Sequence, residues 1–183
     1  MRYLSTRGGD GDASFSDVVL SGLARDGGLF LPSDIPDVRN RLEAWQRLTY
    51  PELALAVMQP FTDVAPAELR RLVERSYATF RHREVTPVVQ VGNVHLLELF
   101  HGPTLAFKDV ALQFLGNLFE RLLAVRQSTM NILGATSGDT GSAAIHGVRG
   151  RHGMRIVMLH PEGRVSRVQA LQMTSVLDEN VHN

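Results

Sequence analysis

The spacing of apolar residues along the chain changes near residue 82. Between residues 42 and 80, apolar residues recur every three or four positions, which predicts three helices. Pro66 lies at or near the first turn of the third helix, a position that proline favours. We therefore expect residues 1–82 to form a mostly helical N-terminal region.

Within that region, residues 1–32 carry two strand-like fragments separated by turns. Gly8 to Asp12 has the composition of a loop, and Asp26-Gly27-Gly28 is a turn signal before an apolar run. Between these turns, Ser14 is expected to cap a short helix.

From residue 83 onward, the pattern is that of strands alternating with helices. Gly92-Asn93 separates two short apolar runs and predicts a hairpin. The helix expected after residue 108 carries Leu112, Leu115, Leu118, Phe119 and Leu122 at helical spacing. The elements expected after it are a strand at 130–133, a helix at 140–152, a strand at 155–160 and a helix from about 165. This alternation predicts an α/β fold with a parallel sheet over residues 83–183.

The predicted sheet contains few strands. Only about three strands and a hairpin precede residue 183, and Asn180-Val-His-Asn183 lies where the next buried strand should begin. Doubly wound sheets usually contain more strands. We therefore expect this chain to be the incomplete N-terminal part of a longer protein.

Composition narrows the function classes. The 183 residues are 44% hydrophobic and 21% charged, with a formal net charge of zero, which disfavours nucleic acid as the main partner. The chain has no cysteine, and its seven histidines show no metal-ligand spacing, so we assign no metal. No apolar run approaches the ~20 residues of a membrane span, and no signal peptide is evident. We expect a cytoplasmic protein without a membrane partner.

The chain contains eighteen arginines and a single lysine, Lys108. Guanidinium is not a useful nucleophile, whereas a lysine amine attacks carbonyls and forms Schiff bases with substrates or pyridoxal phosphate. Lys108 follows Phe107 and precedes Asp109, where a loop meets a helix. Asp109 fits a helix-start carboxylate better than a catalytic group. From residue usage alone, Lys108 could also be an ordinary surface lysine.

A second candidate site is the loop from Gly134 to Ala144, between a strand and a helix. It combines glycines with the hydroxyls of Thr136, Ser137, Thr140 and Ser142. Such a loop at the carboxyl end of a parallel strand can hold a carboxylate or phosphate. The alternative is an ordinary capped helix start. Arg164 and Arg167 follow the next strand, where a solvated loop is the better interpretation than an anion site.

Several motifs, in order along the chain, resemble segments of the threonine synthase family. The longest are Leu97-Glu-Leu-Phe-His-Gly-Pro-Thr-Leu-Ala-Phe-Lys-Asp-Val-Ala-Leu-Gln113 and Ala135-Thr-Ser-Gly-Asp-Thr-Gly-Ser-Ala-Ala144. Similar segments are Tyr3 to Gly8, Gly22 to Pro32, Leu159 to Ser166, Gln172-Met173-Thr174 and Asn180 to Asn183. The similarity covers almost the whole chain and is weakest at about 35–80.

This resemblance implies an α/β fold of the tryptophan-synthase-β type (fold type II), with pyridoxal 5'-phosphate as cofactor. Residues 1–82 would be the family's N-terminal region, and residues 83–183 the start of the cofactor-binding domain. The implied reaction converts O-phospho-L-homoserine and water to L-threonine and phosphate, the last step of threonine biosynthesis. The implied partners are this substrate and the C-terminal remainder of the enzyme. That remainder would supply the residues that bind the cofactor phosphate.

The resemblance also assigns roles to individual residues. Lys108 would bind the cofactor and later move protons. Asp139 would lie beside the cofactor's 3-hydroxyl group, and Phe107 would flank the lysine. The residues that would receive the substrate carboxylate are Thr136, Ser137, Gly138 and Thr140. Two alternatives stay open: a related dehydratase that uses the same cofactor, and a truncated, non-catalytic binding module.

Overall fold

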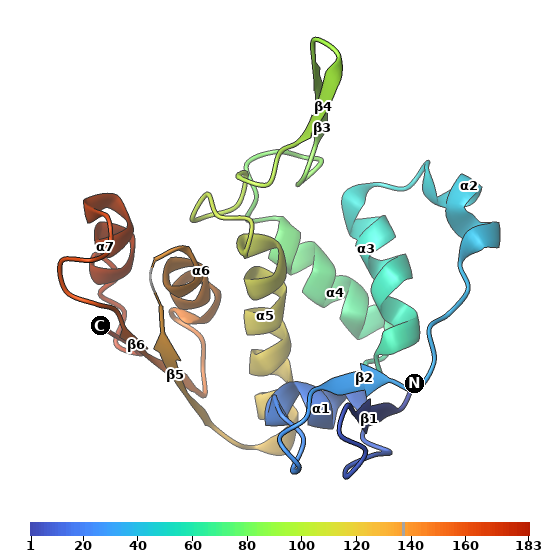
Figure 1. Ribbon diagram of the computed structural model, residues 1–183, viewed down its shortest axis with the longest axis horizontal. Helices are drawn as coiled ribbons and strands as arrows, with labels where there is room; N and C mark the ends of the chain where they lie inside the picture. The colour runs from blue at the N-terminus through green and yellow to red at the C-terminus, as the bar shows by residue number, and fades with distance from the viewer. Residues whose placement is uncertain (137) are drawn as a thin grey trace. The chain divides into compact units, whose positions relative to one another are not determined.

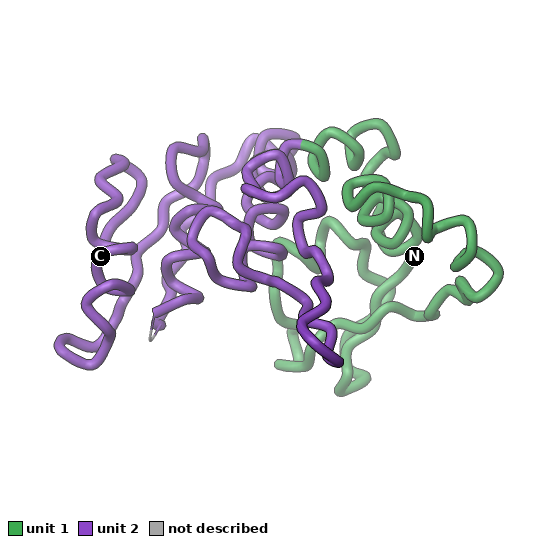
Figure 2. Tube along the Cα trace, turned by 90° about the horizontal axis from the view of Figure 1, so that it is seen from above, with its two compact units in different colours: residues 1–74 green, residues 75–183 purple. Residues whose placement is uncertain are grey.

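The computed structural model describes residues 1–136 and 138–183. The chain divides into two compact units, residues 1–74 and residues 75–183 (Figure 2). This division lies close to the change of pattern near residue 82. The assignment of residues 1–82 and 83–183 as domains stays a prediction.

The first unit is mostly helical, with a small two-stranded sheet. Its elements are β1 (Tyr3–Ser5), α1 (Phe15–Ser21), β2 (Phe30–Pro32), the 3-10 turn η1 (Arg39–Arg41), α2 (Leu42–Trp45), α3 (Tyr50–Met58), the 3-10 turn η2 (Gln59–Phe61) and most of α4 (Pro66–Tyr77). Strands β1 and β2 pair antiparallel. The expected helices and the turn before β2 are confirmed.

Local sequence explains how these elements begin and dock. The Ser14 side chain accepts a hydrogen bond from the Asp17 N–H and caps α1, as expected. Tyr3 is buried, and its hydroxyl donates to the Phe61 carbonyl over 2.6 Å. The N-terminal strand is thereby attached to the helical part of its own unit.

The second unit contains an antiparallel hairpin and a three-stranded parallel sheet (Figure 1). Its elements are β3 (Val88–Val91), β4 (Val94–Leu97), α5 (Asp109–Arg126), β5 (Met130–Ala135), α6 (Asp139–Val148), β6 (Met154–Leu159), α7 (Arg167–Thr174) and β7 (Val181–His182). The sheet order is β5-β6-β7, with β6 parallel to both neighbours. The hairpin turning at Gly92-Asn93 and the βα alternation are confirmed.

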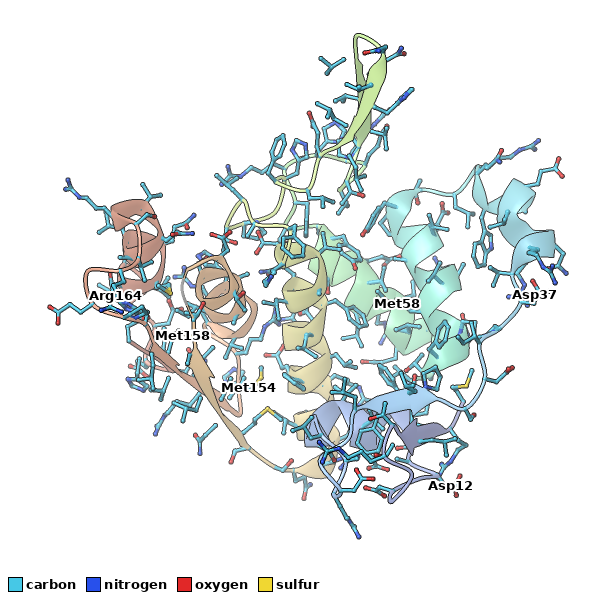
Figure 3. The ribbon with its side chains drawn as sticks, viewed as in Figure 1. Asp12, Asp37, Met58, Met154, Met158 and Arg164 are labelled. Atoms are coloured by element: carbon cyan, nitrogen blue, oxygen red, sulfur yellow. The ribbon has the colours of Figure 1, made fainter. Side chains whose placement is uncertain are left out.

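Helices α5 and α6 pack against one face of the sheet. Leu112, Leu115 and Phe119 of α5 surround an apolar cavity of about 90 Å³ together with Ile132 of β5 and Ile156 of β6. Met154 and Met158 of β6, labelled in Figure 3, are also buried. Apolar burial of this kind is the main stabilising contribution to such a layer.

Two glycines set the distance between α5 and α6. A Cβ atom on Gly116 would collide with the Gly147 carbonyl oxygen, and one on Gly147 would collide with the Leu112 carbonyl oxygen. The two backbones can approach closely only because both positions lack side chains. This contact fixes the C-terminal end of α6 against α5.

A row of polar residues along α5 anchors this helix. Asn117 is buried, donates to Ser76 Oγ over 2.8 Å, and accepts from Arg151 over 2.6 Å. Arg151 also contacts Glu120 at 3.1 Å. Because these groups satisfy one another, the helix can carry polar residues into the interior. None of the helices that the structure describes is long and apolar enough to cross a membrane.

Candidate functional site

Lys108 lies directly before α5, at the position that precedes the first helical residue. Its Nζ atom is 4.1 Å from the centroid of the Phe107 ring. Phe107 is 56% exposed, and Lys108 is intermediate in burial. The amine is therefore neither sealed in the interior nor fully solvated, and it can reach a ligand outside the helix.

The loop that presents Lys108 is held by Asp109. This carboxylate is fully buried and accepts two hydrogen bonds from Thr104, one from the N–H over 2.8 Å and one from Oγ1 over 2.9 Å. A Cβ atom on Gly102 would collide with the Asp109 side chain. Asp109 thus closes the loop at its base, and the interpretation of Asp109 as a structural helix-start carboxylate fits this geometry.

The loop between β5 and α6 is organised around Thr136. Its Oγ1 accepts hydrogen bonds from the N–H groups of Gly138, over 3.2 Å, and Gly141, over 3.0 Å. Gly138 has a φ of 149°, which favours glycine, and Gly141 packs against Thr136 and Met173. The hydroxyl of Thr136 therefore shapes the loop, and the helix that follows starts at Asp139.

The other candidates in this loop differ in exposure. Gly138 is buried, whereas Asp139 and Thr140 are exposed. Ser137 lies outside the described residues. The N–H groups of Asp139 and Thr140 belong to the first turn of α6, where a helix provides no acceptors of its own. They are the kind of donors that bind carboxylates and phosphates.

Helix α7 contacts both candidate segments, and residue patterns alone did not identify this role. The Gln169 side chain donates through Nε2 to Asp139 Oδ1 over 2.7 Å. Three residues later, Gln172 donates through Nε2 to the Thr104 carbonyl over 3.0 Å. Ser166, three residues before Gln169, forms a recognisable capping pattern with it, but this pattern reports only the start of a helix.

A half-buried histidine, His146 on α6, lies in the electrostatic field of the same region. Burial lowers the pKa of His146 on α6, and the Arg149 charge lowers it further. The carboxylates of Asp109 and Asp178 act in the opposite direction. His146 is thus held toward its neutral form, and it senses the charge of the residue that closes the lysine loop.

The unit therefore combines a primary amine of intermediate burial with a helix start whose first-turn N–H groups have no acceptor within the helix, and α7 contacts both segments. Among the described residues, no cluster of three or more His, Cys, Asp or Glu side chains could hold a metal ion. The chemistry available to these groups is attack on a carbonyl carbon, binding of an anion and transfer of protons.

Comparison with known proteins identifies the class first. A pyridoxal-phosphate-bound threonine synthase from Brucella melitensis matches the whole chain with a TM-score of 0.94 and 50% identity, over 40% of its own length. The chain therefore has the α/β fold of pyridoxal-phosphate enzymes of the tryptophan-synthase-β type, as the family resemblance implied.

The particular family follows from the sequence comparisons. Residues 2–77 match the family described as threonine synthase N terminus. The chain is 52% identical to threonine synthase of Schizosaccharomyces pombe over 98% of its length, and 50% identical to that of Pseudomonas aeruginosa over 100%. The chain belongs to the threonine synthase family. It spans about two fifths of the length of these relatives, 38% and 40%.

Proposed function

We propose that this chain supplies the lysine and the carboxylate-binding loop of a threonine synthase that converts O-phospho-L-homoserine and water to L-threonine and phosphate. The observation that carries the proposal is the presentation of Lys108, the one lysine of the sequence, by a loop that a buried carboxylate closes. Identity of about 50% to threonine synthases along the whole chain supports the same reaction.

The residues present fit part of a pyridoxal-phosphate site. A primary amine of intermediate burial lies at the start of α5, and an aromatic ring flanks it. At the start of α6, a Cβ atom on Gly138 would collide with Gln169 and one on Gly141 with Thr136, so glycine at both positions lets the loop fold tightly and leaves the N–H groups of the first helical turn to face a ligand. These features suit an aldehyde-bearing cofactor and the carboxylate of an amino acid.

Each residue then has a proposed task. Lys108 holds the cofactor, Asp139 lies beside the 3-hydroxyl group, and Phe107 covers one side of the amine. Thr136, Ser137, Gly138 and Thr140 receive the substrate carboxylate. The contacts of Thr136 with two N–H groups indicate that its hydroxyl contributes by shaping this loop.

The chemical tasks divide between cofactor and protein. Bound pyridoxal phosphate would supply an electron sink for negative charge at the substrate's α-carbon. The Lys108 amine is the proposed base that takes and returns protons at Cα and Cβ. The N–H groups at the start of α6 orient the substrate through its carboxylate.

Other contributions are proposed to come from the C-terminal remainder of the enzyme, because the chain spans only two fifths of its relatives. These include the groups that bind the cofactor's phosphate. The cytoplasmic location that we expect from the sequence stays a prediction.

The test uses the native full-length protein with added pyridoxal phosphate. Intact mass after borohydride reduction should show one cofactor on Lys108, and O-phospho-L-homoserine should release phosphate and yield threonine. Lys108→Arg keeps the charge but removes the nucleophile, and should abolish both results. A keto acid in place of threonine would identify a dehydratase, and an absent adduct in a folded protein would identify a binding module.

A further inference from the structure

The side chains of Gln169 and Gln172 lie three residues apart on α7, so they project from neighbouring positions of one helix. Each is engaged with a different candidate segment. Gln169 contacts Asp139 at the start of α6, and Gln172 contacts Thr104 in the loop that ends at Lys108. One helix therefore connects two loops that are separated by about thirty residues in the sequence.

The bonds fix the orientation of the Gln169 amide. A carboxylate accepts hydrogen bonds and cannot donate one, so the group facing Asp139 Oδ1 at 2.7 Å must be the N–H side. The amide oxygen then faces Ser166 Oγ at 2.9 Å. A Cβ atom on Gly138 would also collide with this amide, so Gln169 packs directly on the loop backbone.

Gln172 completes the set of bonds around Thr104. The N–H and hydroxyl of this buried residue donate to Asp109, and its carbonyl accepts from Gln172 over 3.0 Å. All three polar groups of Thr104 are thus bonded. The loop is held from α5 on one side and from α7 on the other.

We propose that Gln169 and Gln172 are positioning residues that set the placement of Asp139 relative to the Lys108 amine. Gln169 keeps the Asp139 carboxylate in a fixed orientation by donating a hydrogen bond to it. Gln172 holds the loop that ends at Lys108 against α7 by donating to the Thr104 carbonyl. This inference rests on the proposed function, because it concerns how two residues of that site are held together.

The test compares Gln169→Met, Gln169→Glu and Gln172→Met in the native full-length protein. The matched control is Gln127→Met, since Gln127 is exposed at the far end of α5 and its side chain makes no bond among the described residues. Two readouts are followed across pH. They are the dissociation constant for pyridoxal phosphate, from borohydride trapping on Lys108, and the absorption spectrum of the bound cofactor.

Loss of either glutamine should weaken cofactor binding about tenfold, the expected effect of losing one hydrogen bond in such a site. Gln169→Glu places a second carboxyl group against Asp139. At low pH the new group is protonated and donates, so binding should approach the native value. As pH rises, the introduced carboxyl loses its proton, can no longer donate and repels the Asp139 carboxylate, so a new transition should appear in the pH profile. Gln169→Met should show no such transition.

The outcomes separate the inference from the function on which it rests. If the native protein forms no adduct on Lys108 and releases no phosphate, the proposed function fails. If the native protein does both, while the glutamine variants bind and absorb like Gln127→Met at every pH, the positioning role is wrong and the function stands.

Discussion

Replacing Thr104 by valine tests how the lysine loop is held. The change conserves shape and removes the hydroxyl that donates to Asp109 Oδ1 over 2.9 Å. It leaves the backbone bond from the Thr104 N–H to Oδ2 in place. The substitution therefore isolates one hydrogen bond between a hydroxyl and a buried carboxylate, next to the proposed catalytic amine.

The expected cost follows from burial and charge. Thr104 is 5% exposed and Asp109 is fully buried, so water cannot replace the lost donor. A hydrogen bond to a charged group contributes about 1.5–3 kcal/mol, and Thr104→Val should lower the free energy of unfolding by that amount. Asp109→Ala leaves both Thr104 donors without a partner, at about 1–3 kcal/mol each, and should cost about 2–6 kcal/mol.

Thr174→Val is the matched control. The Thr174 hydroxyl donates to the Ala170 carbonyl within α7, at an exposed position and without a charged acceptor. Its loss should change the free energy of unfolding by no more than about 0.5 kcal/mol. Urea unfolding gives the free energy of unfolding of each full-length variant relative to the native protein. Hydrogen exchange across residues 102–110 reports whether the loop itself has loosened.

The decisive result is the order of the losses in unfolding free energy. We expect the largest loss for Asp109→Ala, a smaller one for Thr104→Val and the smallest for Thr174→Val. If Thr104→Val is as mild as Thr174→Val, and exchange in the loop is unchanged, then Asp109 does not hold the loop through the hydroxyl. Faster exchange limited to this loop in Thr104→Val would support the proposed presentation of the amine.

Three further predictions concern the elements around this loop. Gly116→Ala should destabilise the protein by about 1–3 kcal/mol or more, because the new methyl group would collide with the Gly147 carbonyl. An unchanged urea midpoint would contradict the close helix contact. Burial, and next Arg149, lower the pKa of His146 in the folded protein. The unfolded chain therefore binds more protons below the ordinary histidine value of 6.5, and stability should fall as pH drops through this value toward the lowered pKa. In thermal unfolding, His146→Gln should lose less stability than the native protein over this pH range. If both proteins lose stability equally with falling pH, His146 is not the group responsible. Arg151→Lys should lower the free energy of unfolding in urea by about 1–3 kcal/mol. The guanidinium of Arg151 donates to three side-chain and backbone oxygens, and one ammonium group cannot reproduce this geometry. A loss of unfolding free energy below about 0.5 kcal/mol would mean that the Arg151 guanidinium contributes little to stability.

Local signals in the sequence determined the elements and the main chemical groups. Ser14 marks the start of α1 because its side chain replaces a missing helical acceptor. Gly92 tolerates the positive φ of 61° that the hairpin turn requires. Lys108 stands out because no other residue of this chain offers a comparable amine. Such features depend on neighbours within a few residues, so pattern reasoning can find them.

Tertiary structure alone decided which distant residues support the candidate site. In the sequence, Gln169 indicates only a helix start through its capping pattern with Ser166, and Gln172 only lies in a segment that resembles the family, so neither residue reveals which side chains it contacts. Their partners, Asp139 and Thr104, lie 30 and 68 residues away and meet them only after the chain has folded. Gly116 and Gly147 appear separately as mid-helix glycines, which propensity alone counts as unfavourable. Only the crossing of the two helices explains them, since close backbone packing depends on the three-dimensional path of both segments.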